Sequence, residues 1–294
     1  MPGDAASHAL LRRVCGGSSP PVPGTTLRLL FDLLVDEDVP QDYLQELIAA
    51  EPAVCHGFIL LGNQWPWGQA QIVRNHQQAL RQLGRRGALA AVWLLAVRDA
   101  IFSMPSFPDR ARQRLWRHLL LSAWLTRVLF HAQPMEDRIT AFIAALTHDL
   151  GHLLLPQPGA RWNVVWHSDH DRAGDEIRPL RPEDDHSRLG SCLLDLWHAP
   201  APLISTALYH HEPWKAPPVF RSLVVGVRLV DLLAEQLDAD HLPAGSSFLH
   251  HPEVEPLRTI APWDQLPDLE TTLISELPSA MLTVEQLAGL LAPA

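Results

Sequence analysis

The stretch Thr147-His148-Asp149-Leu150-Gly151-His152 follows a dense apolar run and places an imidazole directly beside a carboxylate. On a helix, neighbouring side chains point roughly 100° apart, so both groups reach one site only when that site lies over the helix edge. An aspartate can bridge two metal ions while a histidine anchors one of them. The His-Asp pair is therefore a candidate metal-binding element, although the dipeptide by itself is common.

Further histidines and one aspartate lie on the helices predicted on either side of this stretch. The candidates and their helices are His118 on 109–132, His148 and Asp149 on 137–154, His186 on 184–197, His210 and His211 at the end of 201–210, and Asp231 on 218–236. Each of these helices can direct a ligand to one interior point. The ordered set predicts a buried metal site built from these side chains.

Other interpretations exist for single members of this set and for the remaining histidines. A lone imidazole such as His118 on a largely apolar helix is more often a hydrogen-bonded core group than a ligand. We interpret eight histidines as surface or packing residues: His8, His56, His76, His131, His198, His241, His250 and His251. A second cluster, HSDHD at 167–171, can bind a metal opportunistically, but a solvated, flexible loop is the simpler interpretation of it.

The apolar spacing along the chain predicts helices throughout and almost no strand. Residues 1–24 are rich in Gly, Ser and Pro and predict a mostly disordered lead-in, with a short helix at 6–14. We expect an N-terminal helical lobe at 25–108, a histidine-bearing core at 109–236 and a C-terminal extension at 237–294. The polar segment 156–182 predicts a long loop, which we interpret as a mobile lid over the metal cleft.

Composition narrows the class of protein. The 294 residues carry a net charge of −10, which opposes duplex nucleic acid as a partner. The apolar runs are shorter than a membrane span, and no signal peptide is apparent. The three cysteines lie far apart, which suggests reduced thiols. We therefore expect a cytoplasmic protein, and the richness in Arg, Ala, Leu and Pro suggests a bacterial source.

Several motifs together resemble one family, the HDOD domain of bacterial signalling proteins. After a lead-in that includes Glu51-Pro52 and ALRQLG at 79–84, the motifs are LWRH at 115–118, ALTHDLG at 145–151, EDDH at 183–186, GSCLLDLW at 190–197 and YHHEP at 209–213. The resemblance spans roughly residues 27–233. It implies an HD-superfamily helical bundle, whose sites use His, His-Asp, His, His-His and Asp in this order, and every position is filled here.

The resemblance also implies two classes of function. Many HDOD domains act as signalling or interaction modules, and the related HD-GYP enzymes hydrolyse cyclic di-GMP. This chain departs from the enzyme pattern, because His152 stands where those enzymes carry Lys and Arg114 stands where they can carry Glu. The GYP signature is not evident at 183–194. We favour a signalling module that retains one or two metal ions and binds a partner protein or a nucleotide.

The alternative is a metal-dependent phosphohydrolase or phosphodiesterase acting on a nucleotide or cyclic dinucleotide. Mixed imidazole and carboxylate ligands favour iron, manganese, zinc or nickel, and such an ion lowers the pKa of bound water. Asp149 would then be catalytic as the bridging carboxylate, and His152 would protonate the leaving oxygen or bind phosphate. Arg114 would bind substrate phosphate, although a solvated arginine on a basic helix is an equal interpretation.

Overall fold

The computed structural model describes residues 5–15, 19–64, 72–104, 109–155, 185–238, 252–257, 259–260, 263 and 266–291. Within these ranges every regular element is helical and no strand occurs, which confirms the predicted all-α class. The N-terminal helices are α1 (Ala5–Val14), α2 (Thr25–Val35), α3 (Gln41–Ala49), α4 (Pro52–Gln64) and α5 (His76–Ser103). The core contains α6 (Asp109–Leu129), α7 (Met135–Thr147), η1 (Leu150–Leu154), α8 (His186–Leu196), α9 (Ala201–Tyr209), η3 (Pro213–Lys215) and α10 (Pro218–Asp238). The short α11 (Val254–Leu257) and the long α12 (Leu266–Leu291) follow.

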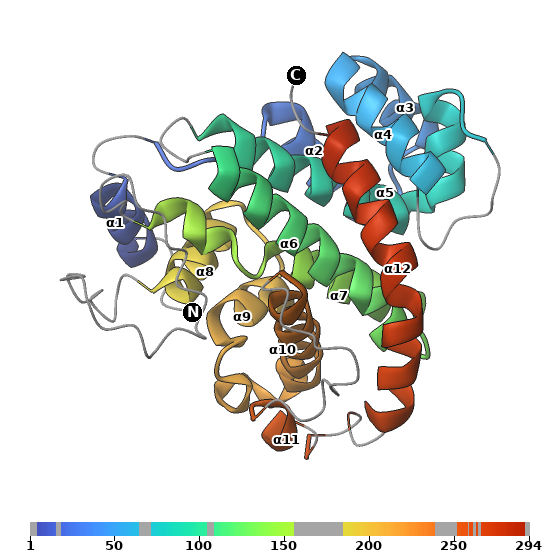
Figure 1. Cartoon of the computed structure of the whole chain (residues 1–294). Helices are drawn as coiled ribbons and strands as arrows, with labels where there is room; N and C mark the ends of the chain where they lie inside the picture. Colours follow the sequence, from blue (N-terminus) through green and yellow to red (C-terminus); the bar gives the residue numbers. More distant parts are fainter. Residues whose placement is uncertain are drawn as a thin grey trace.

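The helices α2 to α5 form the N-terminal lobe, which lies at one end of the molecule in Figure 1. Gly84 breaks α5: its φ is +63°, a backbone conformation that glycine adopts at little cost, and the break divides α5 into two helical parts. The second part is apolar on nearly every side and packs on α7 as well as on its own lobe. It therefore joins the lobe to the core.

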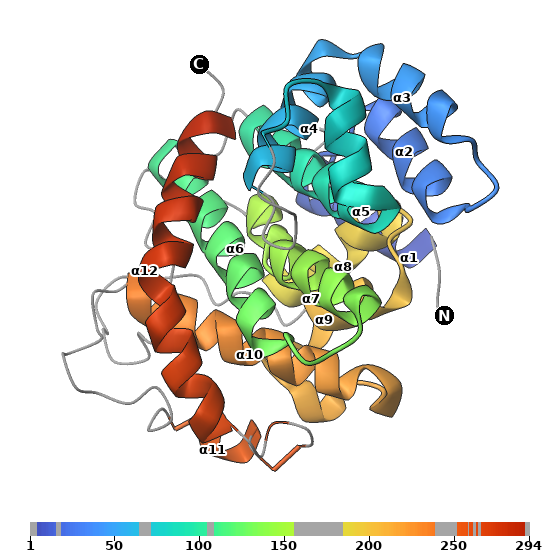
Figure 2. The ribbon, with the colours of Figure 1, turned by 90° about the vertical axis from the view of Figure 1, so that its right-hand side faces the viewer.

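The core is arranged around α6 and α7, which pack against each other along their length (Figure 2). Both helices are almost entirely buried because α9, α10 and α12 cover the remaining sides of α6 or α7. Three ionisable side chains of the core, His118, His148 and Asp231, are all at most 1% exposed. Such burial requires partners for each polar atom.

One predicted helix was wrong in its extent. Residues 137–154 were expected to be continuous, but α7 ends at Thr147 and the 3₁₀ turn η1 follows. Asp149, between them, has φ −104° and ψ 12°, outside the helical region. Apolar spacing continues through this change, so the pattern alone does not show it. The break turns the Asp149 side chain away from the direction that a continuous helix would give it.

The segments outside the core pack onto it. In α1, Leu11 is 1% exposed and the helix contacts α8, while the Trp197 indole N–H donates to the carbonyl of Pro21 at 2.9 Å. At the other end of the chain, α12 lies along α6 and reaches α4 (Figures 1 and 2). Trp263 fits against Gly226 of α10 and Phe130, where a Cβ on the glycine would meet both rings below 3.0 Å. The predicted domain boundaries stay predictions.

No single helix among those described has both the length and the apolar character of a membrane span. The bent pair α3–α4, with 116° between its helices, meets those two criteria only when taken together. The last residues of the predicted N-terminal lobe, 105–108, lie outside the described residues, as do the predicted lid at 156–182 and the HSDHD cluster at 167–171.

Candidate metal centre

The chain brings the seven predicted ligands together where α6, α7, α8, α9 and α10 converge. His118 comes from the middle of α6, and His148 and Asp149 come from the end of α7. His186 begins α8, the pair His210-His211 follows α9, and Asp231 lies on α10. These residues form two groups that each present four possible ligand atoms within 4.8 Å of one another, and Asp149 belongs to both groups.

The first group is His118, His148, Asp149 and Asp231, and all four side chains are at most 5% exposed. The Oδ1 atom of Asp231 lies 3.2 Å from His118 Nε2 and 3.3 Å from His148 Nε2. The Oδ2 atom of Asp149 lies 3.7 Å and 3.6 Å from the same two nitrogens. Two imidazoles and two carboxylates thus face one small interior space.

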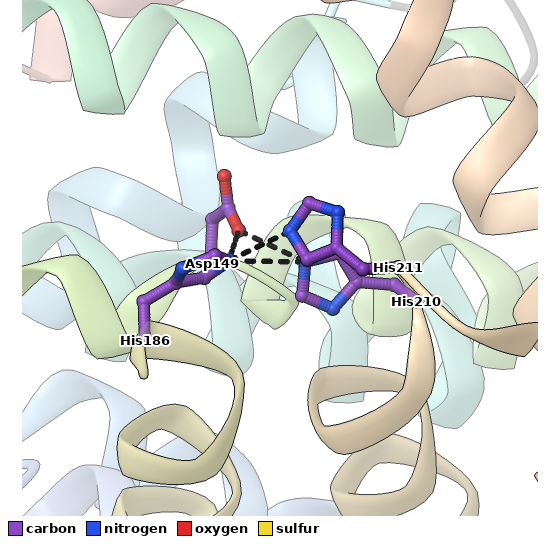
Figure 3. Close-up of side chains that lie close together, drawn as sticks. All are labelled: Asp149, His186, His210 and His211. Atoms are coloured by element: carbon purple, nitrogen blue, oxygen red, sulfur yellow. Dashed lines mark hydrogen bonds and ion pairs between the residues drawn. The ribbon is translucent and has the colours of Figure 1, made fainter. Parts of the chain in front are cut away.

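The second group is Asp149, His186, His210 and His211, shown in Figure 3. The other carboxylate oxygen, Asp149 Oδ1, lies 3.4 Å from His186 Nε2 and 3.3 Å from His210 Nε2. His186 Nε2 also lies 2.9 Å from His211 Nε2. The two oxygens of Asp149 therefore face different groups, which is the arrangement a bridging carboxylate requires.

Contacts at Nδ1 fix which nitrogen three of these imidazoles present, two through backbone carbonyls and one through a carboxylate. His148 Nδ1 lies 2.7 Å from the carbonyl oxygen of Ala145, and His210 Nδ1 lies 2.9 Å from that of Ala207. A carbonyl oxygen only accepts, so each Nδ1 carries the proton and each Nε2 offers a lone pair. His186 Nδ1 lies 3.1 Å from the carboxylate of Asp185, which orients that ring in the same way.

Glycine allows His186 to reach Asp149. A Cβ placed on Gly151 of η1 would lie 1.8 Å from the carbonyl oxygen of His186 and 2.6 Å from the amide nitrogen of Gly190. Those distances leave no room for any side chain, so η1 and the first turns of α8 meet backbone to backbone. Gly151 of the sequence motif therefore lets α8 approach closely enough to place its candidate ligand, His186, beside Asp149.

The electrostatics of the cluster favour ionised carboxylates. Burial alone would raise the pKa of Asp149, but the surrounding imidazoles, His148 first and then His152, hold it well below its usual range. Burial likewise opposes ionisation of Asp231, and His148 and Arg228 reverse that effect, so its pKa is also well below the usual range. Two buried anions require nearby positive charge.

The imidazoles shift in both directions. Burial lowers the pKa of His152 to about 3, and it lowers that of His211 still further, with the neighbouring histidines adding to the effect. Burial also acts on His148 and His186, but nearby aspartates outweigh it and the net pKa of each is raised. These two consequently hold a proton more strongly than His152, His210 or His211 when no cation is bound.

The buried atoms fit a metal ion. Among the described residues, none gives His148 Nε2, Asp149 Oδ1 or Asp231 Oδ1 a well-aligned hydrogen bond, although each atom is buried and faces the cluster. Leaving such an atom unsatisfied costs about 1–3 kcal/mol. His186 Nε2 and His210 Nε2 also lie 3.4 Å apart, close enough for one cation to bind both. Nitrogen and carboxylate ligands together suit a divalent transition metal.

The remaining predicted site residues lie at the edge of the cluster or outside it. His152 stacks on His186 with ring centroids 4.3 Å apart, and its Nε2 lies 3.6 Å from Asp149 Oδ2. Arg114 lies one turn before His118, but its side chain is exposed on α6. Their predicted roles in proton transfer and phosphate binding stay predictions.

Sequence reasoning missed Arg228, which is 2% exposed on α10 and contacts Asp231, Glu235 and Glu253. A signal for it was present: an arginine interrupts an otherwise apolar stretch at 223–230, three residues before Asp231. Around it, burial raises the pKa of Glu235 to about 7, with Asp231 adding to the rise. The pKa of Arg228 is itself raised, because the neighbouring carboxylates, Asp231 foremost, outweigh its burial.

Comparison with known proteins agrees with this fold. The HDOD domain family matches residues 20–213, and the chain belongs to that family. A crystal structure of an HDOD domain protein of unknown function from Geobacter sulfurreducens is 20% identical, with a TM-score of 0.71 over 97% of this chain and 98% of that one. A candidate phosphohydrolase from Shewanella amazonensis SB2B is 18% identical, with a TM-score of 0.68 over 95% and 98%. At these identities the likeness concerns the fold.

A sequence relative is an uncharacterized protein of Treponema pallidum, 22% identical over 209 residues. The match covers 69% of this chain but only 40% of that protein's length. The family match itself ends at residue 213, before α10. Asp231 and Arg228 therefore lie beyond the segment by which the family is recognised.

Proposed function

We propose that this chain is an HDOD signal-transduction module that holds two divalent transition-metal ions, with Asp149 shared between them. The observation that carries the proposal is the division of the Asp149 carboxylate, whose two oxygens face two groups of imidazoles. Iron, manganese, zinc and nickel all suit the mixture of ligands. The sequence analysis left the number open at one or two ions, and the two groups of ligands that share Asp149 favour two.

The positions of the ligands along the chain support the signalling role. They come from α6, the end of α7, the start of α8, the end of α9 and the middle of α10. Metal occupancy therefore fixes the relative position of five segments at once, and binding free energy adds directly to the stability of that arrangement. A partner protein or nucleotide that recognises this arrangement would respond to occupancy.

The direct test is elemental analysis of the full chain purified without a metal-chelating tag. We expect close to two equivalents of a transition metal, and reconstitution of chelator-treated protein should restore the same ratio. Absence of bound metal before and after reconstitution contradicts the proposal. A protein partner is then sought by comparing which proteins the loaded and the chelated forms retain, with the Asp149→Ala variant as the control.

A second candidate function, hydrolysis of a nucleotide phosphoester, is favoured by the same shared carboxylate. Two ions so bridged supply Lewis acidity and lower the pKa of a coordinated water. Asp149 would hold the geometry, and His152, beside it, would bind the phosphate or move a proton to the leaving oxygen. Arg114 would neutralise phosphate charge only if substrate reaches its exposed face of α6.

This candidate is tested by incubating the metal-loaded protein with nucleoside mono-, di- and triphosphates and with cyclic dinucleotides. Turnover that is lost in Asp149→Ala and reduced in His152→Ala supports it. Turnover retained in Asp149→Ala indicates a contaminant, and no turnover by a fully loaded protein leaves the signalling module as the function.

A further inference from the structure

Arg228 is an unusual residue in the core, because its guanidinium is buried beside a centre proposed to bind cations. It is 2% exposed and lies on α10 among Val225, Val227 and Leu229. Its Nη1 atom lies 2.5 Å from Asp231 Oδ2 and 3.5 Å from Glu235 Oε1. Burying a charge is costly unless it is paired and hydrogen-bonded, so this position calls for an explanation.

The contact divides the two oxygens of Asp231. Oδ2 accepts from Arg228, whereas Oδ1 faces His118 Nε2 at 3.2 Å and His148 Nε2 at 3.3 Å and has no well-aligned hydrogen bond among the described residues. A carboxylate held in this way cannot rotate to give both oxygens to one ion. The guanidinium thus directs a single oxygen into the first group of ligands.

A carboxylate from the C-terminal segment holds Arg228 from the opposite side. Glu253 Oε2 accepts from Nη2 at 2.6 Å and from Nε at 3.2 Å. Glu253 just precedes α11 and lies 25 residues from Arg228 in the sequence, well beyond the segment matched by the family. Without Glu253, the positive charge would oppose a nearby cation and would pair more fully with Asp231, in competition with the metal.

We infer that Arg228 is a positioning residue, anchored by Glu253, that orients Asp231 for one of the two proposed ions and thereby sets the affinity of that position. The inference rests on the proposed metal centre and assigns the C-terminal segment a part in it. The second group, formed by Asp149, His186, His210 and His211, does not contain Asp231. The orientation of Asp231 therefore acts directly on one ion.

The alternative is a purely structural ion pair, which would stabilise the fold and leave metal affinity unchanged. Two variants separate the cases. Arg228→Lys keeps the charge but loses the fork that reaches Asp231 and Glu253 together. Glu253→Gln removes the compensating charge at a side chain that is 50% exposed, so the chain should still fold.

Glu276→Gln is the matched control. Glu276 also belongs to the C-terminal segment, is 42% exposed, and pairs with an arginine, Arg127 of α6, at 2.7 Å. It is outside both groups of ligands. Glu276→Gln therefore removes the same charge and the same kind of ion pair as Glu253→Gln, but at a residue outside both groups of ligands.

The experiment titrates chelator-treated full-length protein with Co²⁺, whose visible absorption reports ligand geometry, and measures the thermal stability of the metal-free forms in parallel. For Arg228→Lys we expect one of the two binding steps to weaken by roughly 10–100-fold, the usual effect of replacing a residue that hydrogen-bonds to a metal ligand. The absorption spectrum for that step should also change. Glu253→Gln should weaken the same step by a smaller factor, and Glu276→Gln should match the parent.

Two results would overturn the inference. One is binding of both ions by Arg228→Lys and Glu253→Gln with the affinity of the parent. The other is that both Co²⁺ binding steps of these variants weaken equally, in proportion to the stability that the metal-free variants have lost. If the parent itself binds no Co²⁺, the proposed metal centre is wrong and the inference falls with it, a result distinguishable from the first two.

Discussion

Asp149 is the residue on which the candidate centre depends most. It is 4% exposed, and its backbone, just past the end of α7, sets a direction that lets both oxygens meet imidazoles from four segments. Sequence reasoning identified this residue and the six other candidate ligands, because their order on successive helices was informative. It did not show which oxygen faces which imidazole, since that depends on the turn of the chain after Thr147.

Replacing the shared carboxylate should remove both ions. In Asp149→Ala, neither group keeps four ligands and a buried negative charge is lost, so we expect affinity to fall by more than the roughly 10–100-fold of a change behind a ligand. Elemental analysis after gel filtration measures this directly. Asp42→Ala, at an exposed carboxylate on α3, is the control. Full occupancy in Asp149→Ala would show that Asp149 is not a ligand.

Metal affinity should rise with pH. A protonated imidazole cannot be a ligand, and the pKa values of His148 and His186 are raised above the usual value of 6.5. Protons therefore compete with the metal up to and above that pH, and binding releases them. Calorimetric titration between about pH 6 and about pH 8 should show tighter binding at the higher pH and proton uptake by the buffer. Affinity independent of pH would contradict this.

At the scale of elements, most helices of the core were predictable and their ends were not. Spacing predicted helices at 109–132 and 218–236, and α6 and α10 begin at those residues but end at Leu129 and Asp238. The end of α7 escaped prediction, because its cause is tertiary: Gly151 must touch the backbone of α8. The pairing of Arg228 with Glu253 is likewise tertiary, and no sequence pattern across the 25 positions that separate them specifies it.

Gly151→Ala tests the contact between η1 and α8. The added methyl would lie 1.8 Å from the His186 carbonyl oxygen, so the two segments must separate. We expect a loss of unfolding free energy of at least about 1–3 kcal/mol, the usual cost of overpacking, together with weaker metal binding. Denaturant unfolding of the metal-free protein measures the first effect and metal titration the second.

The control for this substitution is Gly289→Ala on α12. A Cβ there meets nothing within 4 Å, so the same change should stabilise the helix by roughly 0.5–1 kcal/mol. If Gly151→Ala proves as stable as the parent, the backbone contact does not restrict the approach of α8.

At the scale of the whole molecule, the site depends on segments from both sides of the family match. The lead-in packs on α8, which carries His186, and the C-terminal segment packs on α6 and α10, which carry His118 and Asp231. The C-terminal segment was predicted only as an extension, because its helices are separated by many breakers. Its contacts make it part of the structure that surrounds the candidate centre.

The central claim, that this buried cluster is a metal centre, is tested most directly by one melting experiment. The protein is purified without a chelating tag, its metal content is measured, and its Tm is compared before and after treatment with a chelator that is then removed. A ligand at a hundredfold excess over its Kd stabilises the folded protein by about 2.7 kcal/mol. For a chain of this order of size, each kcal/mol raises the Tm by roughly 2–4 °C. We predict a Tm that falls by several degrees on chelation and recovers when the metal is returned. An unchanged melting curve in a protein without bound metal would contradict the account.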